Sequence, residues 1–414
     1  MSEATPPRLP FHYAWVIVFT GMLCIFACLG FGRFALGMLL PSMASTLGLS
    51  YSQIGFISTG NFLGYLASVL LCGQVARRIG SRRLIVIALV LIGASMALIS
   101  RAQNFTTVLL LYMITGIGSG AANVPVMGLI TAWFNRAIRG RAAGFVVIGS
   151  GFAIIISGKL IPFVNANVGQ EGWRMNWLIL AGIVIAIAVI GRLFLRDRPE
   201  EQGLLPLGSE DTHLSPALQE RTSEQSIYRN RSIYLLGAIY FLFGYTYVIY
   251  ATFMVTELVK ERGFSEAVAG TFWSWVGFLS LFSGPVFGTL SDRLGRKAGL
   301  MIVFSLQMLS YLLVAVPDLP MMYLYLSIVF FGIVAWSIPS IMVAAVSEYV
   351  GPDKALAAFG FITFIFGLGQ ITGPSIAGML AERTGTFSSS FFMAAAFAGI
   401  AIVLVNFLRK PHHQ

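Results

Sequence analysis

One stretch reveals an internal repeat in the sequence, namely Gly288-Thr-Leu-Ser-Asp292-Arg293-Leu-Gly295-Arg296-Lys297-Ala298. A related stretch occurs earlier in the chain. Residues 73–83 read Gly-Gln-Val-Ala-Arg-Arg-Ile-Gly-Ser-Arg-Arg, at an offset of 215. The same offset pairs Gly48, Ser50 and Gly55 with Gly263, Ser265 and Gly270, and Gly158 with Gly373. Agreement at three separate places predicts that the chain contains two homologous halves.

The composition excludes most classes of soluble protein. The 414 residues include 27 Lys and Arg and 17 Asp and Glu, so that 11% are charged, while 57% are hydrophobic. An ordinary soluble protein has about 25% charged residues. A soluble enzyme, a nucleic-acid binder and a disordered regulator are therefore excluded as interpretations of the whole chain. The net charge of +10 is instead typical of a membrane protein with basic cytoplasmic loops.

Apolar stretches of the length needed to cross a bilayer recur along the whole chain. A spanning helix needs about 20 apolar residues. We predict twelve transmembrane helices, at residues 14–43, 52–73, 84–100, 106–133, 142–164, 175–195, 233–256, 267–288, 299–316, 321–346, 356–381 and 387–408.

The basic residues predict the orientation of these helices. If both termini are cytoplasmic, 20 Lys and Arg lie in inner segments and 5 in outer segments, and the other two lie within helices. This bias predicts cytoplasmic N- and C-termini by the positive-inside rule.

The domain organisation follows from the repeat and from one polar stretch. The predicted fold class is an all-α integral membrane protein with two pseudo-symmetric six-helix bundles, at residues 12–195 and 232–410. Residues 196–231 are polar and lack an apolar period, which predicts a cytoplasmic linker, part of which could form a surface helix. Repeats of this kind place the substrate site between the halves, near the bilayer midplane.

The quoted stretch resembles the loop motif of the major facilitator superfamily, in the loop between helices 8 and 9. The first copy, between helices 2 and 3, departs from the family pattern at Arg77, where the family usually has Asp, and this puts the usual lock of the N-terminal half in doubt. The resemblance implies a gating role for Gly73, Arg78, Gly80, Gly288, Asp292, Arg293, Gly295 and Arg296.

Other stretches resemble the monocarboxylate and oxalate/formate carriers within this superfamily. They are Gly116-Ile-Gly118-Ser-Gly120, Arg139-Gly140-Arg141-Ala-Ala-Gly144 and Arg196-Asp-Arg-Pro-Glu-Glu-Gln-Gly203. The resemblance implies a carboxylate substrate. One departure is that helices 8 and 11 lack the basic residues of oxalate carriers. Two further features disfavour a drug/proton antiporter. Such antiporters usually have a Gly-Pro pair in helix 5, where this chain has Gly158-Lys159. Many of them also have an Arg in helix 4, where this chain has Tyr112.

Two cations lie in the middle of predicted helices, whereas every Asp and Glu lies in a loop or at a helix end. Arg33 is about eleven residues from the outer end of helix 1, which is roughly 16 Å and so near the midplane. A guanidinium can bind a carboxylate through two parallel hydrogen bonds, so we predict that Arg33 binds the substrate. The alternative is that Arg33 caps carbonyls where Gly30 and Gly32 loosen helix 1. Lys159, nearer the outer end of helix 5, either reaches the headgroups or lines the pathway.

The remaining candidates for substrate binding are polar or aromatic residues in helices that line the cavity of this family. Tyr245 and Tyr247 correspond through the repeat to Gly30 and Gly32, so we expect both to face Arg33. The full set is Asn61, Tyr112, Asn123, Tyr245, Tyr247, Trp273, Trp336 and Gln370.

The combined prediction is a secondary active transporter in the cytoplasmic membrane that moves a mono- or dicarboxylate by alternating access. A multidrug or metabolite exporter of the same fold is the alternative, and a non-transporting membrane sensor is a third hypothesis. We expect a monomer without cofactor, metal or nucleic acid, which is not an enzyme. The lack of a mid-helix carboxylate suggests anion exchange, facilitated diffusion, or a proton carried with the substrate.

Overall fold

The computed structural model describes residues 11–135, 137–209 and 231–408, apart from the side chains of residues 352 and 353. Most of the predicted linker and six of the basic residues counted for the orientation lie outside the described residues. These six are Arg8, Arg136, Arg221, Arg229, Arg409 and Lys410.

Helices account for nearly all of the described chain. In order they are α1 (Ala14–Ile25), η1 (Phe26–Phe34), α2 (Ala35–Leu47), α3 (Tyr51–Ile79), α4 (Ser81–Ile99), α5 (Phe105–Trp133), α6 (Arg139–Val168), α7 (Gly172–Phe194), η2 (Pro199–Gln202), α8 (Arg231–Lys260), α9 (Glu266–Leu294), α10 (Arg296–Ala315), α11 (Met321–Val334), α12 (Ser337–Val350), α13 (Pro352–Thr384) and α14 (Ser388–Asn406). Twelve helical segments are long and apolar enough to cross a membrane, which confirms the predicted number. One of them, Ala14–Leu47, joins α1, η1 and α2, and another, Met321–Val350, joins α11 and α12.

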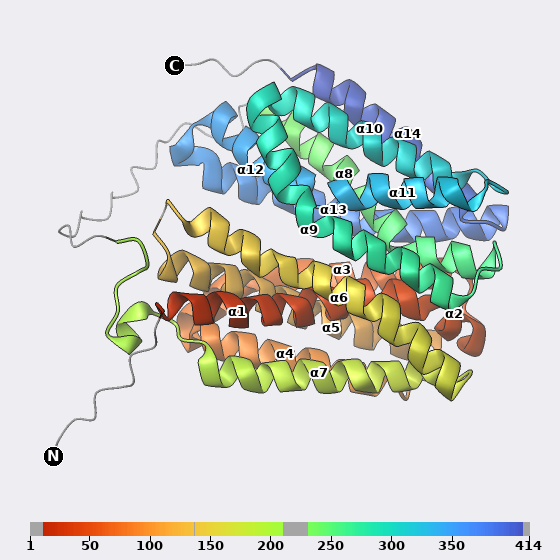
Figure 1. Cartoon of the computed structure of the whole chain (residues 1–414), viewed down its shortest axis with the longest axis horizontal. Coiled ribbons are helices and arrows are strands. Elements are labelled where there is room, and N and C mark those ends of the chain that lie inside the picture. The colour runs from red at the N-terminus through yellow and green to blue at the C-terminus, as the bar shows by residue number, and fades with distance from the viewer. Residues whose placement is uncertain (1–10, 136, 210–230, 409–414) are drawn as a thin grey trace.

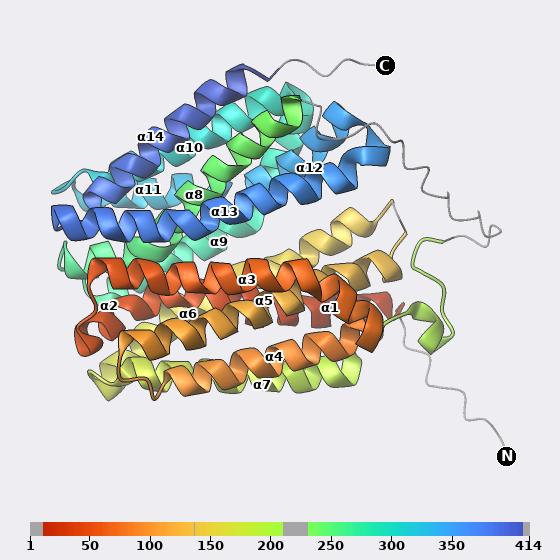
Figure 2. The ribbon, with the colours of Figure 1, turned by 180° about the vertical axis from the view of Figure 1, so that it is seen from behind.

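The helices form two halves that lie against each other as two layers (Figures 1 and 2). One layer contains α1 to α7 and the other contains α8 to α14. The start of α1 and the end of α14 lie at the same end of the bundle, which we call the termini face, and we call the opposite end the far face. This arrangement confirms the predicted fold class of two six-helix bundles.

Two of the contacts between the halves are helix crossings that the repeat relates to each other. At the α6–α9 crossing, a Cβ atom on Gly270 would lie 2.1 Å from the carbonyl oxygen of Gly158. At the α3–α13 crossing, a Cβ atom on Gly55 would lie 2.4 Å from the carbonyl oxygen of Pro374. Gly55 and Gly270 are equivalent through the offset of 215, and so are Gly158 and Gly373. Gly55, Gly158 and Gly270 thus lie where the backbones of the halves approach each other, whereas Gly373 faces Tyr245 of α8 in its own half.

Hydrogen bonds between the halves reinforce the far face. The Tyr51 hydroxyl donates to the Gly385 carbonyl at 3.4 Å, and the Ser52 backbone N–H donates to the Glu382 carboxylate at 3.1 Å. The Asn165 side-chain amide at the end of α6 donates to Glu266 at the start of α9 at 2.6 Å. All three contacts join helix ends at the far face, so this face is closed in the structure.

The described start of the linker packs under the N-terminal half. It contains the short 3₁₀ helix η2 and no other helix within residues 196–209. The Trp133 indole N–H donates to the Arg196 carbonyl at 3.0 Å, and the Leu207 N–H donates to the Trp133 carbonyl at 2.9 Å. These bonds fix the segment to the end of α5.

Candidate functional site

The central candidate residue, Arg33, lies in a π-helix. Residues Phe26–Phe34 form η1, which interrupts helix 1 near the middle of its span. A π-helix widens each turn, and such segments are frequent at functional sites. The neighbours come unusually close here, since a Cβ atom on Gly30 would lie 2.0 Å from the Ala153 Cβ and one on Gly32 2.7 Å from the Ser119 hydroxyl.

Side chains of neighbouring helices donate hydrogen bonds to carbonyls of η1. The Ser119 hydroxyl donates to Cys28 at 2.7 Å, the Asn61 amide to Gly32 at 3.1 Å, and the Tyr112 hydroxyl to Arg33 at 2.9 Å. Backbone groups released from regular helix geometry inside a membrane need such partners. The polar residues of α3 and α5 therefore stabilise the π-helix and set the position of Arg33.

The Arg33 guanidinium lies between two aromatic rings of α3. Its Cζ atom is 4.6 Å from the centre of the Phe62 ring and 4.1 Å from the centre of the Tyr65 ring. Its Nε and Nη2 atoms are buried and have no hydrogen-bond partner within the described residues. The carbonyl-capping alternative for Arg33 finds no support, because no described carbonyl accepts a hydrogen bond from the guanidinium. Two buried donors on a cation thus remain free for an anion.

A narrow pocket between the halves contains Arg33. It has room for about one water molecule in this arrangement. The lining from the first half includes Arg33, Asn61 and Tyr112, and the lining from the second half includes Ala251 and Thr252 of α8. The site therefore draws on both halves, as expected for a substrate site at a repeat interface.

Other predicted residues surround this pocket through direct contacts. The Asn123 amide donates to the Tyr65 hydroxyl at 2.8 Å, so it holds one of the rings that cover Arg33. The Tyr247 hydroxyl accepts a hydrogen bond from Gln370 and interacts with Arg33. Tyr247 also packs on Trp336, with ring centres 5.9 Å apart.

Two predicted residues lie away from Arg33. The Tyr245 hydroxyl donates to the Met393 sulfur at 3.4 Å, toward α14. Residues two apart in a helix point to different sides, so Tyr245 and Tyr247 cannot both face Arg33 from α8. The exposed Lys159 ammonium donates to the Thr271 hydroxyl at 2.8 Å in the α6–α9 seam. The structure therefore does not bring Tyr245 or Lys159 into the Arg33 pocket.

The two motif loops at the termini face are built alike but carry different charges. Gly80 and Gly295 both have φ of +89°, which lets a single residue join consecutive helices. In the second copy, Arg296 pairs with Asp292 and, at 2.7 Å, with Glu348 of α12. The offset of 215 places Arg77, Ser81 and Trp133 at the positions of this triad, so the first half has a cation in place of the first acid and no charge at the other two positions.

The remaining motif residues make few contacts here. A Cβ atom on Gly73 or Gly288 would meet nothing within 4 Å, so the close helix approach expected of these glycines is not seen in this arrangement. Arg78 and Arg293 are exposed. In the first half, the Asp197 carboxylate accepts a hydrogen bond from the Arg82 backbone N–H at 2.7 Å and so caps the N-terminus of α4.

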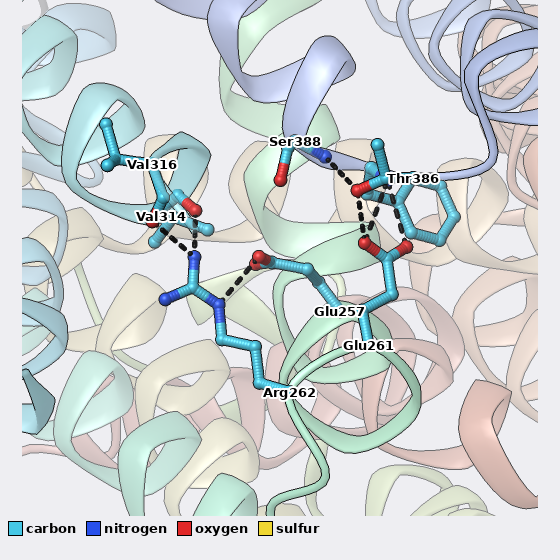
Figure 3. Close-up of polar contacts among 8 residues, drawn as sticks. Glu257, Glu261, Arg262, Val314, Val316, Thr386 and Ser388 are labelled. Carbon is cyan, nitrogen blue, oxygen red and sulfur yellow. Dashed lines mark hydrogen bonds and ion pairs between the residues drawn. The ribbon is translucent and has the colours of Figure 1, made fainter. Parts of the chain in front are cut away.

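One acidic residue just beyond the predicted helix 233–256 is fully buried. Glu257, in the last turn of α8, is 1% exposed and pairs with Arg262 at 2.9 Å (Figure 3). Arg262 also donates to the carbonyls of Val314 and Val316, and Glu261 accepts from Thr386 (Figure 3). These contacts connect the end of α8 with the end of α10 and the start of α14, all at the far face of the second half.

No described cluster of three or more His, Cys, Asp or Glu residues could hold a metal ion.

The chain is matched over residues 25–406 by the family model described as "Uncharacterised MFS-type transporter YbfB". The chain thus belongs to the major facilitator superfamily of membrane transporters, within this MFS-type transporter family. This confirms the resemblance drawn from the loop motif and the prediction that the protein is not an enzyme.

Several curated relatives are organic anion carriers. The chain is 23% identical to a probable sulfoacetate transporter of Cupriavidus necator, with 94% of this chain and 92% of the relative covered. It is 25% identical to a hexuronate transporter of Bacillus subtilis, with 90% of each covered. It is 24% identical to monocarboxylate transporter 2 of Mesocricetus auratus, with 97% of this chain and 85% of the relative covered. These names agree with the predicted likeness to organic anion carriers.

Solved structures show the same fold. A bacterial homologue of the human lysosomal transporter Spinster, inward-facing and unoccupied, matches with a TM-score of 0.74 at 15% identity over 97% of both chains. The nucleoside transporter NupG matches with a TM-score of 0.72 at 17% identity over 96% of this chain and 98% of the other.

Proposed function

We propose that this transporter carries a small organic anion and binds its anionic group at Arg33, between the two halves. The observation that carries the proposal is the buried Arg33 guanidinium, whose Nε and Nη2 atoms have no hydrogen-bond partner among the described residues. A charge near the middle of a bilayer costs at least about 2.5 kcal/mol, and a bound carboxylate would compensate it. Relatives named for sulfoacetate, hexuronate, monocarboxylate and tartrate support the same class of substrate.

Transport by alternating access fits the contacts between the halves. The far face is joined by hydrogen bonds and glycine crossings, and it would open when the halves rock about the central pocket. By the positive-inside rule we place the termini face in the cytoplasm and the protein in the cytoplasmic membrane. In this orientation the structure is closed toward the outside. One chain contains both halves, so we propose a monomer as the working unit.

The placement of acids limits the coupling mechanism. No Asp or Glu of the described chain lines the pocket of Arg33, and Glu257 is held by Arg262 at the end of α8. Proton-coupled carriers commonly use a titrating carboxylate inside the membrane. We therefore propose that the driving partner is an exchanged anion, or a proton that moves with the substrate.

The test is uptake of radiolabelled carboxylates into proteoliposomes by the wild type, Arg33→Ala and Arg101→Ala. Arg101 is exposed in a far-face loop, so its variant is the matched control for loss of an arginine. We expect uptake by the wild type and Arg101→Ala and none by Arg33→Ala, with all three proteins melting cooperatively in detergent. Unchanged transport by Arg33→Ala would rule out the proposed anion site. Stabilisation of the wild type by organic cations alone would instead indicate an exporter.

A further inference from the structure

A second pocket adjoins the pocket of Arg33. Phe34 and Ala251 line both pockets and separate them. The second pocket also lies between the halves and is lined by aromatic rings, chiefly those of Tyr247, Trp273 and Trp336. We call it the aromatic pocket. None of its described lining residues is charged and, like the first pocket, it has room for about one water molecule in this arrangement.

The surface that lines the aromatic pocket is wholly apolar in this arrangement, although two of its described lining residues carry unpartnered indole N–H groups. The indole Nε1 atoms of Trp273 and Trp336 are buried and have no hydrogen-bond partner among the residues that the structure describes. Buried indole N–H groups usually find a partner. Phe34 packs on Trp336 with ring centres 5.1 Å apart, so the ring that separates the pockets is part of the same aromatic cluster.

We infer that the substrate is a monoanion, with its charged group on Arg33 and its uncharged, largely apolar body in the aromatic pocket. This inference rests on the proposed function and narrows its substrate class. A displacement of the Phe34 ring would join the two pockets into one elongated site. The body would then lie against the apolar surface of the aromatic pocket.

The balance of charges supports a monoanion over a dianion. Among the residues that the structure describes, Arg33 is the only charged one that lines either pocket. A monoanion neutralises it, whereas a dianion would leave one buried negative charge without a partner. An unpaired buried charge is strongly unfavourable. Lys159 does not supply a second cation here, because its ammonium binds Thr271 and lines neither pocket.

The experiment compares binding of matched monoanions and dianions to the purified transporter. The panel pairs butyrate with succinate and benzoate with terephthalate, at about pH 7.5, where all these carboxyl groups are ionised. Affinities are measured by isothermal titration and by thermal shift. We expect the monoanion of each pair to bind at least about tenfold more tightly, which corresponds to about 1.4 kcal/mol.

Variants separate this inference from the proposed function. Arg33→Gln should abolish binding of every anion. Trp336→Arg, which adds a cation to the aromatic pocket, should reverse the preference toward the dianions, while Trp336→Phe keeps the ring and should preserve the preference for monoanions. If dianions bind the wild type more tightly and Arg33→Gln abolishes that binding, the inference is overturned and the proposed function stands. If no anion of the panel binds, or Arg33→Gln binds as the wild type does, the proposed function itself fails.

Discussion

Gly158 of α6 and Gly270 of α9 meet backbone to backbone where the two halves of the transporter cross. A Cβ atom on Gly158 would lie 2.4 Å from the Gly270 carbonyl oxygen, and the reverse distance is 2.1 Å. Neither neighbour is a flexible side chain that could move aside. The crossing therefore requires glycine at both positions for the far face to close as it does.

Gly270→Ala should therefore push α6 and α9 apart. Overpacking of this kind typically costs about 1–3 kcal/mol, so we expect a lower melting temperature in detergent and slower uptake. The control is Gly128→Ala in α5, because a Cβ atom there meets nothing within 4 Å. Alanine is also the better helix former, so this control should melt at or slightly above the wild-type temperature. Equal melting temperatures for the two variants would contradict the packing argument.

Arg33→Lys should be a poor substitute even though it keeps the positive charge. An ammonium lacks the planar fork that donates two parallel hydrogen bonds to a carboxylate, and it stacks less well on the rings of Phe62 and Tyr65. We expect a loss of at least about tenfold in kcat/KM for uptake, or about 1.4 kcal/mol. Initial uptake rates over a range of substrate concentrations measure this. Wild-type rates would show that only the charge matters.

Tyr112→Phe should affect substrate binding through the position of Arg33. The lost hydrogen bond, 2.9 Å from the Tyr112 hydroxyl to the Arg33 carbonyl, is worth about 1 kcal/mol. The matched control is Tyr250→Phe, which removes a buried hydroxyl bonded to Ser327 at 2.9 Å, and neither of these residues lines a pocket. Both variants should melt slightly earlier, but only Tyr112→Phe should raise KM. An equal rise of KM in both would show that Tyr112 has no specific positioning role.

Arg262→Leu should destabilise the second half strongly. It leaves the Glu257 carboxylate buried without its partner, since the side chains of Glu257 and Arg262 are only 2% and 11% exposed. Breaking a buried pair on one side costs roughly 3–5 kcal/mol, whereas replacing both partners by apolar residues is often close to neutral. We therefore expect the double variant Glu257→Leu/Arg262→Leu to recover much of the melting temperature lost by Arg262→Leu. A double variant no more stable than the single one would show that the carbonyl contacts of Arg262 dominate.

The architecture was largely predictable because it leaves repeated marks in the sequence. Twelve apolar stretches of bilayer length predict the helices, and the glycines that the offset of 215 pairs include Gly55, Gly158 and Gly270, which lie at contacts between the halves. Arg33 could be singled out because a charge in the middle of an apolar helix is rare. The sequence also allowed the prediction that Tyr245 and Tyr247 do not both face Arg33, since residues two apart in a helix face different sides.

The details of the site were not predictable in the same way. Phe62 and Tyr65 carry no distinguishing signal in a chain with 33 Phe and 14 Tyr, so their role as a cover for Arg33 appears only in three dimensions. The π-helix depends on hydrogen bonds from α3 and α5, and Gly30 and Gly32 only hint at it. The unpartnered indoles of Trp273 and Trp336 require knowledge of every surrounding acceptor.

The π-helix at Phe26–Phe34 gives the first transmembrane helix a segment whose hydrogen-bond pattern can change. Its Ala35 N–H bonds to the Gly30 carbonyl, five residues back, where an α-helix would reach back four. A local return to the four-residue pattern would turn Arg33 about the helix axis while the helix stays unbroken and its backbone groups stay bonded. Such a change would let the Arg33 side chain reorient together with a bound substrate, without any part of helix 1 becoming a flexible loop.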